Sequence, residues 1–146
     1  MNAIERRAVG GLALVYWLRM LGLFMVLPVL AAYATDYERA TPVLVGLAVG
    51  VYGLTQAILQ LPFGLVSDRI GRVPVIVVGL AIFLCGSLVA ASAESIEMLI
   101  VGRALQGAGA IAAAVNALLA DLTRPEVRTT AMALLGVSIG MAFLLA

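Results

Sequence analysis

A short charged segment between two long apolar runs sets the strongest limit on how this chain can fold. Within residues 64–72 the charges fall inside five positions, at Asp68, Arg69 and Arg72. Apolar runs precede and follow the segment, over residues 42–66 and 73–91. Because charged side chains are costly in hydrocarbon, we expect this segment to be a short loop at a membrane surface, with a membrane-spanning helix on either side.

The composition of the whole chain agrees with a membrane location. Of its 146 residues 64% are apolar and 12% are charged, and the mean hydropathy is +1.14, whereas a soluble domain is about half apolar and about a quarter charged. There is no histidine, and the single cysteine, Cys85, can form no intrachain disulfide. The net charge of +1 indicates no nucleic-acid partner. We therefore expect an all-α integral membrane protein whose direct partner is the lipid bilayer.

Five apolar runs have the length of membrane spans, for which about 20 residues are needed. They cover about residues 10–34, 42–66, 75–91, 96–119 and 129–146. The last run stops at Ala146 without a polar tail, so we interpret it as an incomplete span of a truncated chain. The expected fold is one polytopic transmembrane helix bundle.

The first run has a rival interpretation as a cleaved signal peptide, because Ala32-Tyr33-Ala34 resembles a cleavage site. A signal peptide has an apolar region of only about 7–15 residues without a central charge, whereas this run contains Arg19. We therefore favour a span, in which Pro28 should kink the helix or end its regular hydrogen bonding. Thr41 and Pro42 should cap and begin the second span.

The arginines predict the orientation of the spans. With the N-terminus in the cytoplasm, only Arg39 falls outside, and six arginines fall inside: Arg6, Arg7, Arg69, Arg72, Arg124 and Arg128. This distribution follows the positive-inside rule, and the opposite orientation would reverse it. In the inner loop after the fourth span, Thr123 and Glu126 have the spacing of a capping box.

Two charges remain inside the predicted spans, at Arg19 and Arg103. A charge that faces lipid costs about 3 kcal/mol on insertion scales, so we expect both side chains to face a cavity or an internal partner. The alternative without a functional role is that the side chain snorkels to the membrane interface. This suits Arg103 better than Arg19, because Arg103 lies nearer the end of its span. Tyr52, Gln56 and Gln60 recur at steps of four and form a polar stripe that should face protein or water.

Small residues mark the faces where helices should pack closely. In the second span these are Gly46, Gly50 and Gly53, and in the fourth span they run from Gly107 to Ala114, next to Gln106.

No predicted span contains an aspartate or glutamate deep in its core, although a proton-coupled carrier usually needs a buried group that changes charge. Arginine is in practice never deprotonated. A titrating carboxylate must therefore come from a loop, as with Asp36 or Glu97, or from chain beyond this sequence. No nucleophile, metal-ligand cluster or carboxylate pair is visible in the spans, so we expect no enzyme, no cofactor and no metal site.

Three segments resemble motifs of the major facilitator superfamily. Residues 64–72 resemble its signature G-x-L-x-D-R-x-G-R between helices two and three. Arg103-Ala104-Leu105-Gln106-Gly107 resembles its R-x-x-x-G motif on helix four, and residues 121–128 resemble the D-x-x-x-x-x-x-R segment that follows. Stretches at 18–22, 25–30 and 52–56 are similar to its YajR-like subgroup. The motifs occur in the family's order and cover most of the chain.

The resemblance implies the N-terminal part of a twelve-helix transporter built from two six-helix halves, with the C-terminal half missing here. It implies a cytoplasmic latch motif at Gly64, Asp68, Arg69, Gly71, Arg72, Asp121 and Arg128. It also implies that helices one and four line the cavity, which agrees with the independent placement of Arg19 and Arg103. The expected cavity or coupling residues are Arg19, Gln56, Gln60, Arg103, Gln106 and Gly107.

The expected function is secondary active transport of a small solute by alternating access in the inner cell membrane, with proton-driven efflux by an antiporter as its finer form. The alternative is a structural or sensory membrane protein on a carrier scaffold, which solute flux would distinguish. A four-helix drug exporter would need a buried carboxylate in its first helix, where this chain has Arg19.

Overall fold

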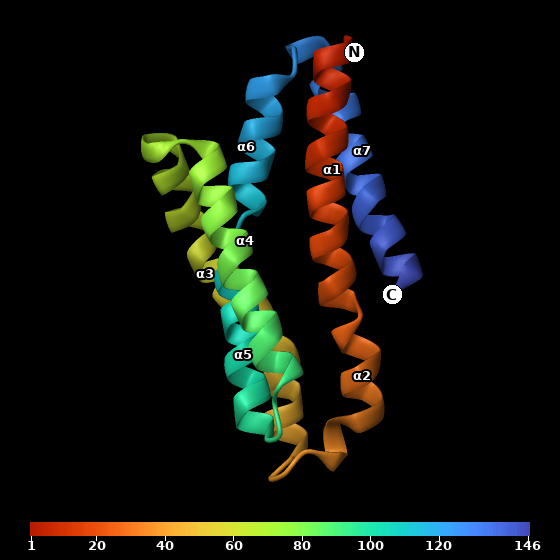
Figure 1. Cartoon of the computed structure of the whole chain (residues 1–146), viewed down its shortest axis with the longest axis vertical. Coiled ribbons are helices and arrows are strands. Elements are labelled where there is room, and N and C mark those ends of the chain that lie inside the picture. Colours follow the sequence, from red (N-terminus) through yellow and green to blue (C-terminus); the bar gives the residue numbers. More distant parts are fainter. The chain divides into compact units, whose positions relative to one another are not determined.

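The computed structural model describes all residues 1–146 and consists of helices without any β-strand. Five helical stretches are long and apolar enough to cross a membrane, and the chain order of the elements can be followed in Figure 1. These stretches are Ala3–Asp36, Pro42–Ile70, Arg72–Ala91, Ile96–Leu122 and Pro125–Leu145. The chain is therefore an all-α transmembrane bundle fragment.

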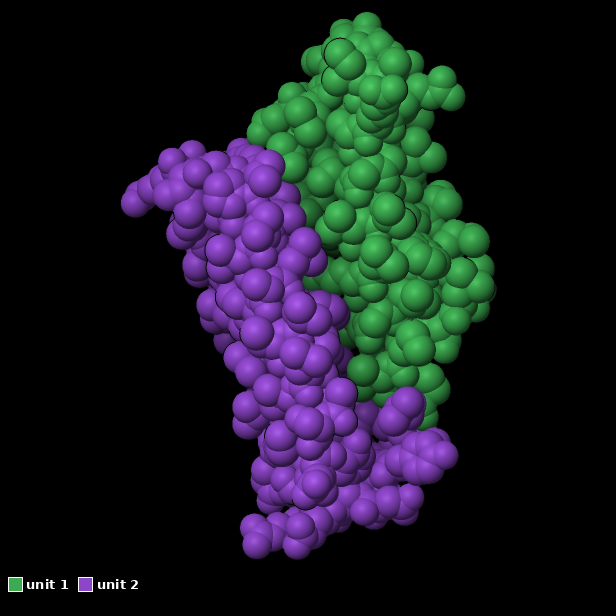
Figure 2. Space-filling view, viewed as in Figure 1, with its two compact units in different colours: residues 1–28, 115–146 green, residues 29–114 purple.

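Seven α-helices and one short 3-10 helix make up these stretches. The first contains α1 (Ala3–Phe24), α2 (Val26–Tyr33) and the 3-10 helix η1 (Ala34–Asp36), and α3 (Pro42–Ile70) and α4 (Arg72–Ala91) follow. The fourth stretch contains α5 (Ile96–Ala108) and α6 (Ala112–Leu122), and α7 (Pro125–Leu145) is the last. Two compact units contain these elements: residues 1–28 with 115–146 form unit 1, and residues 29–114 form unit 2 (Figure 2).

Helix starts follow the local sequence at three places. Asn2 and Glu5 form a reciprocal capping box at α1, Thr41 accepts a hydrogen bond from the amide of Leu44, and Ser95 caps α5. Side-chain oxygens at these positions satisfy amides that have no partner within the helix. The predicted start of the second span at Thr41 and Pro42 is confirmed.

The predicted capping box at Thr123 and Glu126 is wrong. Arg124 is the residue that precedes α7, and no side chain caps this helix. The Thr123 hydroxyl instead donates to the carbonyl of Leu119, one turn back in α6. Pro125 occupies the first helical turn, where its missing N–H costs nothing.

Two predicted spans are interrupted. The first breaks at Met25, and Pro28 explains this because it has no N–H to donate to the carbonyl of Phe24. The end of regular helical hydrogen bonding that was expected from Pro28 is therefore confirmed. The fourth run was expected to be one continuous helix, but residues 109–111 separate α5 from α6.

The segment expected to be a loop at 64–72 is mostly helical. Helix α3 continues through Asp68 to Ile70, and only Gly71 separates it from α4. Gly71 has a φ of 106°, a left-handed conformation that costs other residues free energy. The sharp turn between the two spans therefore depends on this glycine.

Close helix packing in unit 2 uses the predicted Gly107 but not the predicted glycines of α3. A Cβ on Gly46, Gly50 or Gly53 would meet nothing within 4 Å, so this face of α3 packs closely against no other helix of unit 2. The close approaches are made by α5 with α3 and α4. A Cβ on Gly86 would lie 2.5 Å from the amide nitrogen of Gln106, and one on Gly107 would lie 2.3 Å from the carbonyl oxygen of Tyr52.

In unit 1 the long helices α1 and α7 pack against each other. Their apolar contact includes Phe24 and Phe143, whose ring centroids are 5.3 Å apart in an edge-to-face arrangement with an interplanar angle of 86°. This geometry is favoured by the quadrupoles of the two rings. Val9 and Ala131 are buried in the same unit.

Candidate functional site

Arg103 lies at the centre of a buried polar network in unit 2. Its side chain is 1% exposed, and its Nη1 donates to Oε1 of Gln106 at 2.9 Å. The Gln106 amide then donates from Nε2 to Oγ of Ser87 at 2.9 Å, and the Ser87 hydroxyl donates to the carbonyl of Phe83 at 2.8 Å. Each donor in this series of hydrogen bonds has one acceptor, so the network holds the Gln106 amide in a single orientation.

Helix α3 supplies the remaining contacts of the guanidinium. Nε of Arg103 donates to the carbonyl of Ala48 at 3.3 Å, and the Tyr52 ring lies 5.0 Å from the guanidinium carbon, within cation–π range. No carboxylate forms an ion pair with Arg103. The positive charge is therefore held by neutral groups, an arrangement that is costly in a low-dielectric interior.

Gly107 brings the backbones of α5 and α3 together beside this network. A Cβ at position 107 would lie 2.0 Å from the Thr55 hydroxyl oxygen. That hydroxyl lies 3.1 Å from the carbonyl of Ala104 and within hydrogen-bond distance of two carbonyls of its own helix. The absence of a side chain at position 107 thus permits this contact between the two helices.

The polar stripe of α3 is only partly enclosed. Tyr52 is 9% exposed, whereas Gln56 and Gln60 are half-buried. Oε1 of Gln56 is itself buried and has no hydrogen-bond partner in the chain. An acceptor of this kind requires a donor from water, solute or further protein.

The latch-motif residues of unit 2 lie around the α3–α4 turn. Arg72 forms an ion pair with Asp68, four residues earlier, and also donates to the Ser67 hydroxyl at 2.8 Å. Arg69 is exposed. A Cβ added at Gly64 would lie 3.4 Å from the Cβ of Ala113. The turn therefore presents one internally paired carboxylate and one exposed cation.

The other predicted site residues belong to unit 1. Arg19 is buried in α1 with 3% exposure, Asp121 is exposed near the end of α6, and Arg128 donates to the carbonyl of Ala120 at 3.0 Å. The joint latch of Asp68, Arg72 and Asp121 stays a prediction, as does a shared cavity for Arg19 and Arg103.

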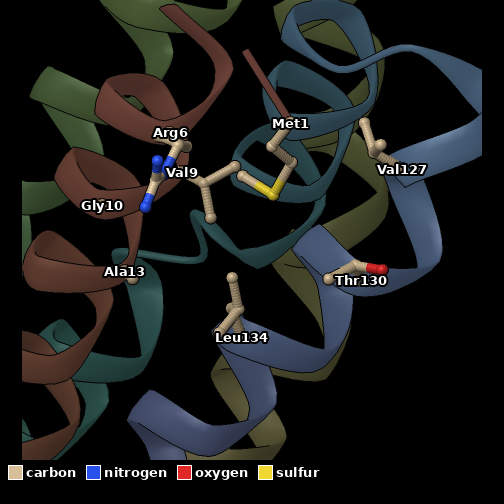
Figure 3. Close-up of a pocket in the computed structure, with 8 residues that line it drawn as sticks. All are labelled: Met1, Arg6, Val9, Gly10, Ala13, Val127, Thr130 and Leu134. Carbon is tan, nitrogen blue, oxygen red and sulfur yellow. The ribbon is translucent and has the colours of Figure 1, made fainter. Parts of the chain in front are cut away.

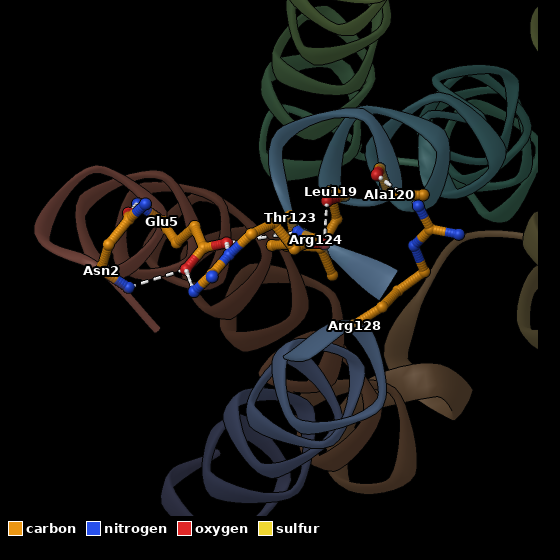
Figure 4. A network of polar contacts seen from close by, with 7 residues as sticks. All are labelled: Asn2, Glu5, Leu119, Ala120, Thr123, Arg124 and Arg128. Atoms are coloured by element: carbon orange, nitrogen blue, oxygen red, sulfur yellow. Dashed lines mark hydrogen bonds and ion pairs between the residues drawn. The ribbon is translucent and has the colours of Figure 1, made fainter. Parts of the chain in front are cut away.

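An ion pair between Glu5 and Arg124 was not anticipated from the sequence (Figure 4). The Glu5 carboxylate is almost fully buried and accepts from Nε of Arg124 at 2.9 Å and from the Asn2 amide at 2.7 Å. These interactions lower the pKa of Glu5 from 4.5 to about 2, and the hydrogen bond from the Arg124 side chain has the largest effect. Only the Asn2–Glu5 capping-box spacing was visible in the sequence.

Ser87 was also missed, because it lies in an otherwise apolar span. A lone serine in such a span gives no local signal of its partner. Its contact with Gln106 joins residues 19 positions apart and appears only once α4 packs on α5.

Comparisons with known proteins agree with this architecture. The Major Facilitator Superfamily profile matches residues 12–146. The chain is 61% identical over 142 residues to the inner membrane transport protein YajR of Escherichia coli, which covers 97% of this chain and 31% of that protein. It is 48% identical over 145 residues to an uncharacterized transporter of Buchnera aphidicola, covering 99% of this chain and 37% of the relative.

A shorter match, 48% identical over 60 residues, is to multidrug resistance protein D of Escherichia coli and covers 41% of this chain and 15% of that protein. The chain thus spans about a third of the length of the curated relatives that it matches throughout. With five apolar helical stretches, the motifs in order and a family match over nearly its whole length, the chain belongs to the Major Facilitator Superfamily.

Proposed function

We propose that the full-length protein is a secondary active transporter that moves a small solute across the inner membrane by alternating access. Family membership supports this proposal, together with relatives that are named as transporters. In this proposal the present chain is part of the N-terminal six-helix half, with its N-terminus in the cytoplasm. The C-terminal half completes the cavity.

The observation that carries the proposal is the buried charge of Arg103. A cation that is 1% exposed and surrounded only by neutral partners is a costly arrangement for a purely structural role. We assign Arg103 a part in coupling, in which its charge attracts an anionic group of the solute or biases a nearby carboxylate toward its ionised form. Gln106 accepts a hydrogen bond from Arg103, and Gly107 permits the close contact of α5 with α3 beside it. Arg19, Gln56 and Gln60 are proposed to line the same pathway.

The finer proposal is export of the solute in exchange for protons. The partial match to multidrug resistance protein D supports export. The spans of this chain carry aspartate or glutamate only near their ends, so the proton must bind to one of these carboxylates or to the rest of the protein. Asp36 in η1 and Glu97 in the first turn of α5 are the candidates.

The latch motif is proposed to control the conformational equilibrium. Asp68 and Arg72, already paired at the α3–α4 turn, would join Asp121 to hold the two halves together on the cytoplasmic side in the outward-open state. Gly64, Arg69, Gly71 and Arg128 complete the motif.

The proposal is tested with the full-length protein in liposomes under an imposed pH gradient, with ethidium and a panel of neutral and anionic dyes as probes. We expect gradient-driven flux of at least one probe. Arg103→Ala should reduce this flux by a factor of about ten or more, and Arg39→Ala, a change in a loop, is the control and should leave it unchanged. Flux that is unimpaired in Arg103→Ala would exclude the coupling role. No gradient-driven flux of any probe would favour the non-transporting alternative.

A further inference from the structure

A groove lies between the first turns of α1 and α7 in unit 1 (Figure 3). Its volume is about 530 Å³, within the range of about 300–1,000 Å³ that is typical of ligand pockets. Eight residues line it: Met1, Arg6, Val9, Gly10, Ala13, Val127, Thr130 and Leu134. Most are apolar, and on each helix they recur at steps of three or four, so they form two facing stripes.

The groove has one charged lining residue, and that charge is not neutralised by the chain. The side chain of Arg6 makes no hydrogen bond or ion pair with any residue of the chain. Its neighbour Glu5 is directed elsewhere, since its carboxylate accepts hydrogen bonds from Asn2 and Arg124 (Figure 4). The groove therefore combines an apolar wall with an unpaired guanidinium at the end nearer the N-terminus.

The position of the groove along the helices matches the polarity gradient of a lipid leaflet. The helical stretch Ala3–Asp36 has 34 residues and is about 51 Å long at 1.5 Å per residue, whereas the hydrocarbon core is about 30 Å thick. Arg6 lies in the first turns of this stretch, at headgroup level, and Gly10 and Ala13 continue toward the hydrocarbon. A molecule that fills the groove thus needs an anionic head and an apolar tail.

We propose that the groove between α1 and α7 binds one anionic phospholipid, with its phosphate at Arg6 and an acyl chain along Val9, Gly10 and Leu134. The lipid comes from the leaflet on the side of the N-terminus. The groove belongs to unit 1 and the Arg103 network to unit 2, and the proposal does not depend on which solute the protein transports.

Two pairs of variants in the full-length protein separate the groove from the general positive charge of the surface. Arg6→Gln removes the charge that lines the groove, and Arg7→Gln removes the adjacent charge that does not. Gly10→Leu places a side chain in the groove. Gly11→Leu is the matched control, because Gly11 does not line the groove. A Cβ at either glycine would meet nothing within 4 Å, so neither change should cause a clash at this atom.

Each protein is reconstituted with phosphatidylethanolamine and phosphatidylglycerol, and the phosphatidylglycerol retained after detergent extraction is measured by native mass spectrometry. We expect Arg6→Gln to weaken retention about fivefold, since one basic residue near a membrane surface contributes about that factor, and Gly10→Leu to abolish it. Arg7→Gln and Gly11→Leu should retain the lipid as the parent protein does.

Equal losses in Arg6→Gln and Arg7→Gln would show nonspecific surface attraction and overturn the proposal, as would unchanged retention in Gly10→Leu. Unfolding of full-length Gly10→Leu with normal Gly11→Leu would also overturn it, because another protein segment would then occupy the groove.

Discussion

Glu5 and Arg124 are 119 positions apart in the sequence, yet the carboxylate of one accepts hydrogen bonds from both the backbone amide and the side chain of the other. The same carboxylate accepts from the Asn2 amide and completes the cap of α1. One buried side chain thereby joins the start of α1 to the residue that precedes α7. The ends of these two helices are consequently coupled in stability.

We predict that Glu5→Gln and Arg124→Gln lower the melting temperature of the full-length protein non-additively. Each single change removes the same charge pair, so the double variant should be little worse than the more damaging single one. Thermal unfolding of the four proteins in detergent measures this coupling. Glu126→Gln, an exposed carboxylate in the first turn of α7, is the control. Fully additive losses would show that the two residues act independently.

The Glu5 ion pair should also be resistant to acid. The pKa of Glu5 is lowered from 4.5 to about 2. Between these two pH values the unfolded chain therefore binds a proton at Glu5 more readily than the folded chain does. The stabilising contribution is fully present above about pH 4.5 and is lost as the pH falls toward 2. The difference in melting temperature between the parent and Glu5→Gln should therefore be constant above pH 5 and shrink below 4.5. A difference that disappears near neutral pH would contradict this assignment.

Ser87→Ala should destabilise unit 2 because it leaves Nε2 of Gln106 without its acceptor. An unsatisfied buried donor costs about 1–3 kcal/mol, and Ser87→Thr should restore part of this by keeping the hydroxyl. Ser92→Ala is the control, since its exposed hydroxyl contacts only its own helix. Thermal stability of the full-length variants checks the prediction, and equal effects at the two serines would argue against the network.

Gly107→Ala should separate α5 from α3, because its methyl group would lie 2.0 Å from the Thr55 oxygen. Overpacking of this kind typically costs about 1–3 kcal/mol. Gly53→Ala on α3 meets open space and should be neutral or slightly stabilising. Unfolding measurements on both variants test this contrast. A stable Gly107→Ala protein would mean that the two helices are not in close contact.

Asp68→Asn should weaken the proposed cytoplasmic latch. The change removes the charge that pairs with Arg72, so we expect a population shift away from the outward-open state. Distances between spin labels on the two halves of the full-length protein report this population, with exposed Glu94→Gln as the control. An unchanged distribution in Asp68→Asn would rule out this role.

The breaks in the helices show how far local sequence can be used. Pro28 predicts an interruption because a missing N–H acts within its own helix. No equally strong local signal marks residues 109–111, which lie in a run of small apolar residues that also suits a continuous helix. Gly46, Gly50 and Gly53 of α3 were predicted to pack closely but do not do so within unit 2, because a small residue permits close packing and does not select a partner.

Composition and hydropathy are enough to identify an all-α membrane protein with five apolar helical stretches, because hydrocarbon satisfies no backbone polar group and a long apolar helix satisfies its own. They also place Arg103 and Arg19 as charges within those helices. The contacts of Arg103 with Gln106 and Ala48, the contribution of Ser87 from α4 and the pairing of Glu5 with Arg124 arise only when the helices pack. Such contacts depend on which helix faces meet, and local residue patterns do not specify that pairing.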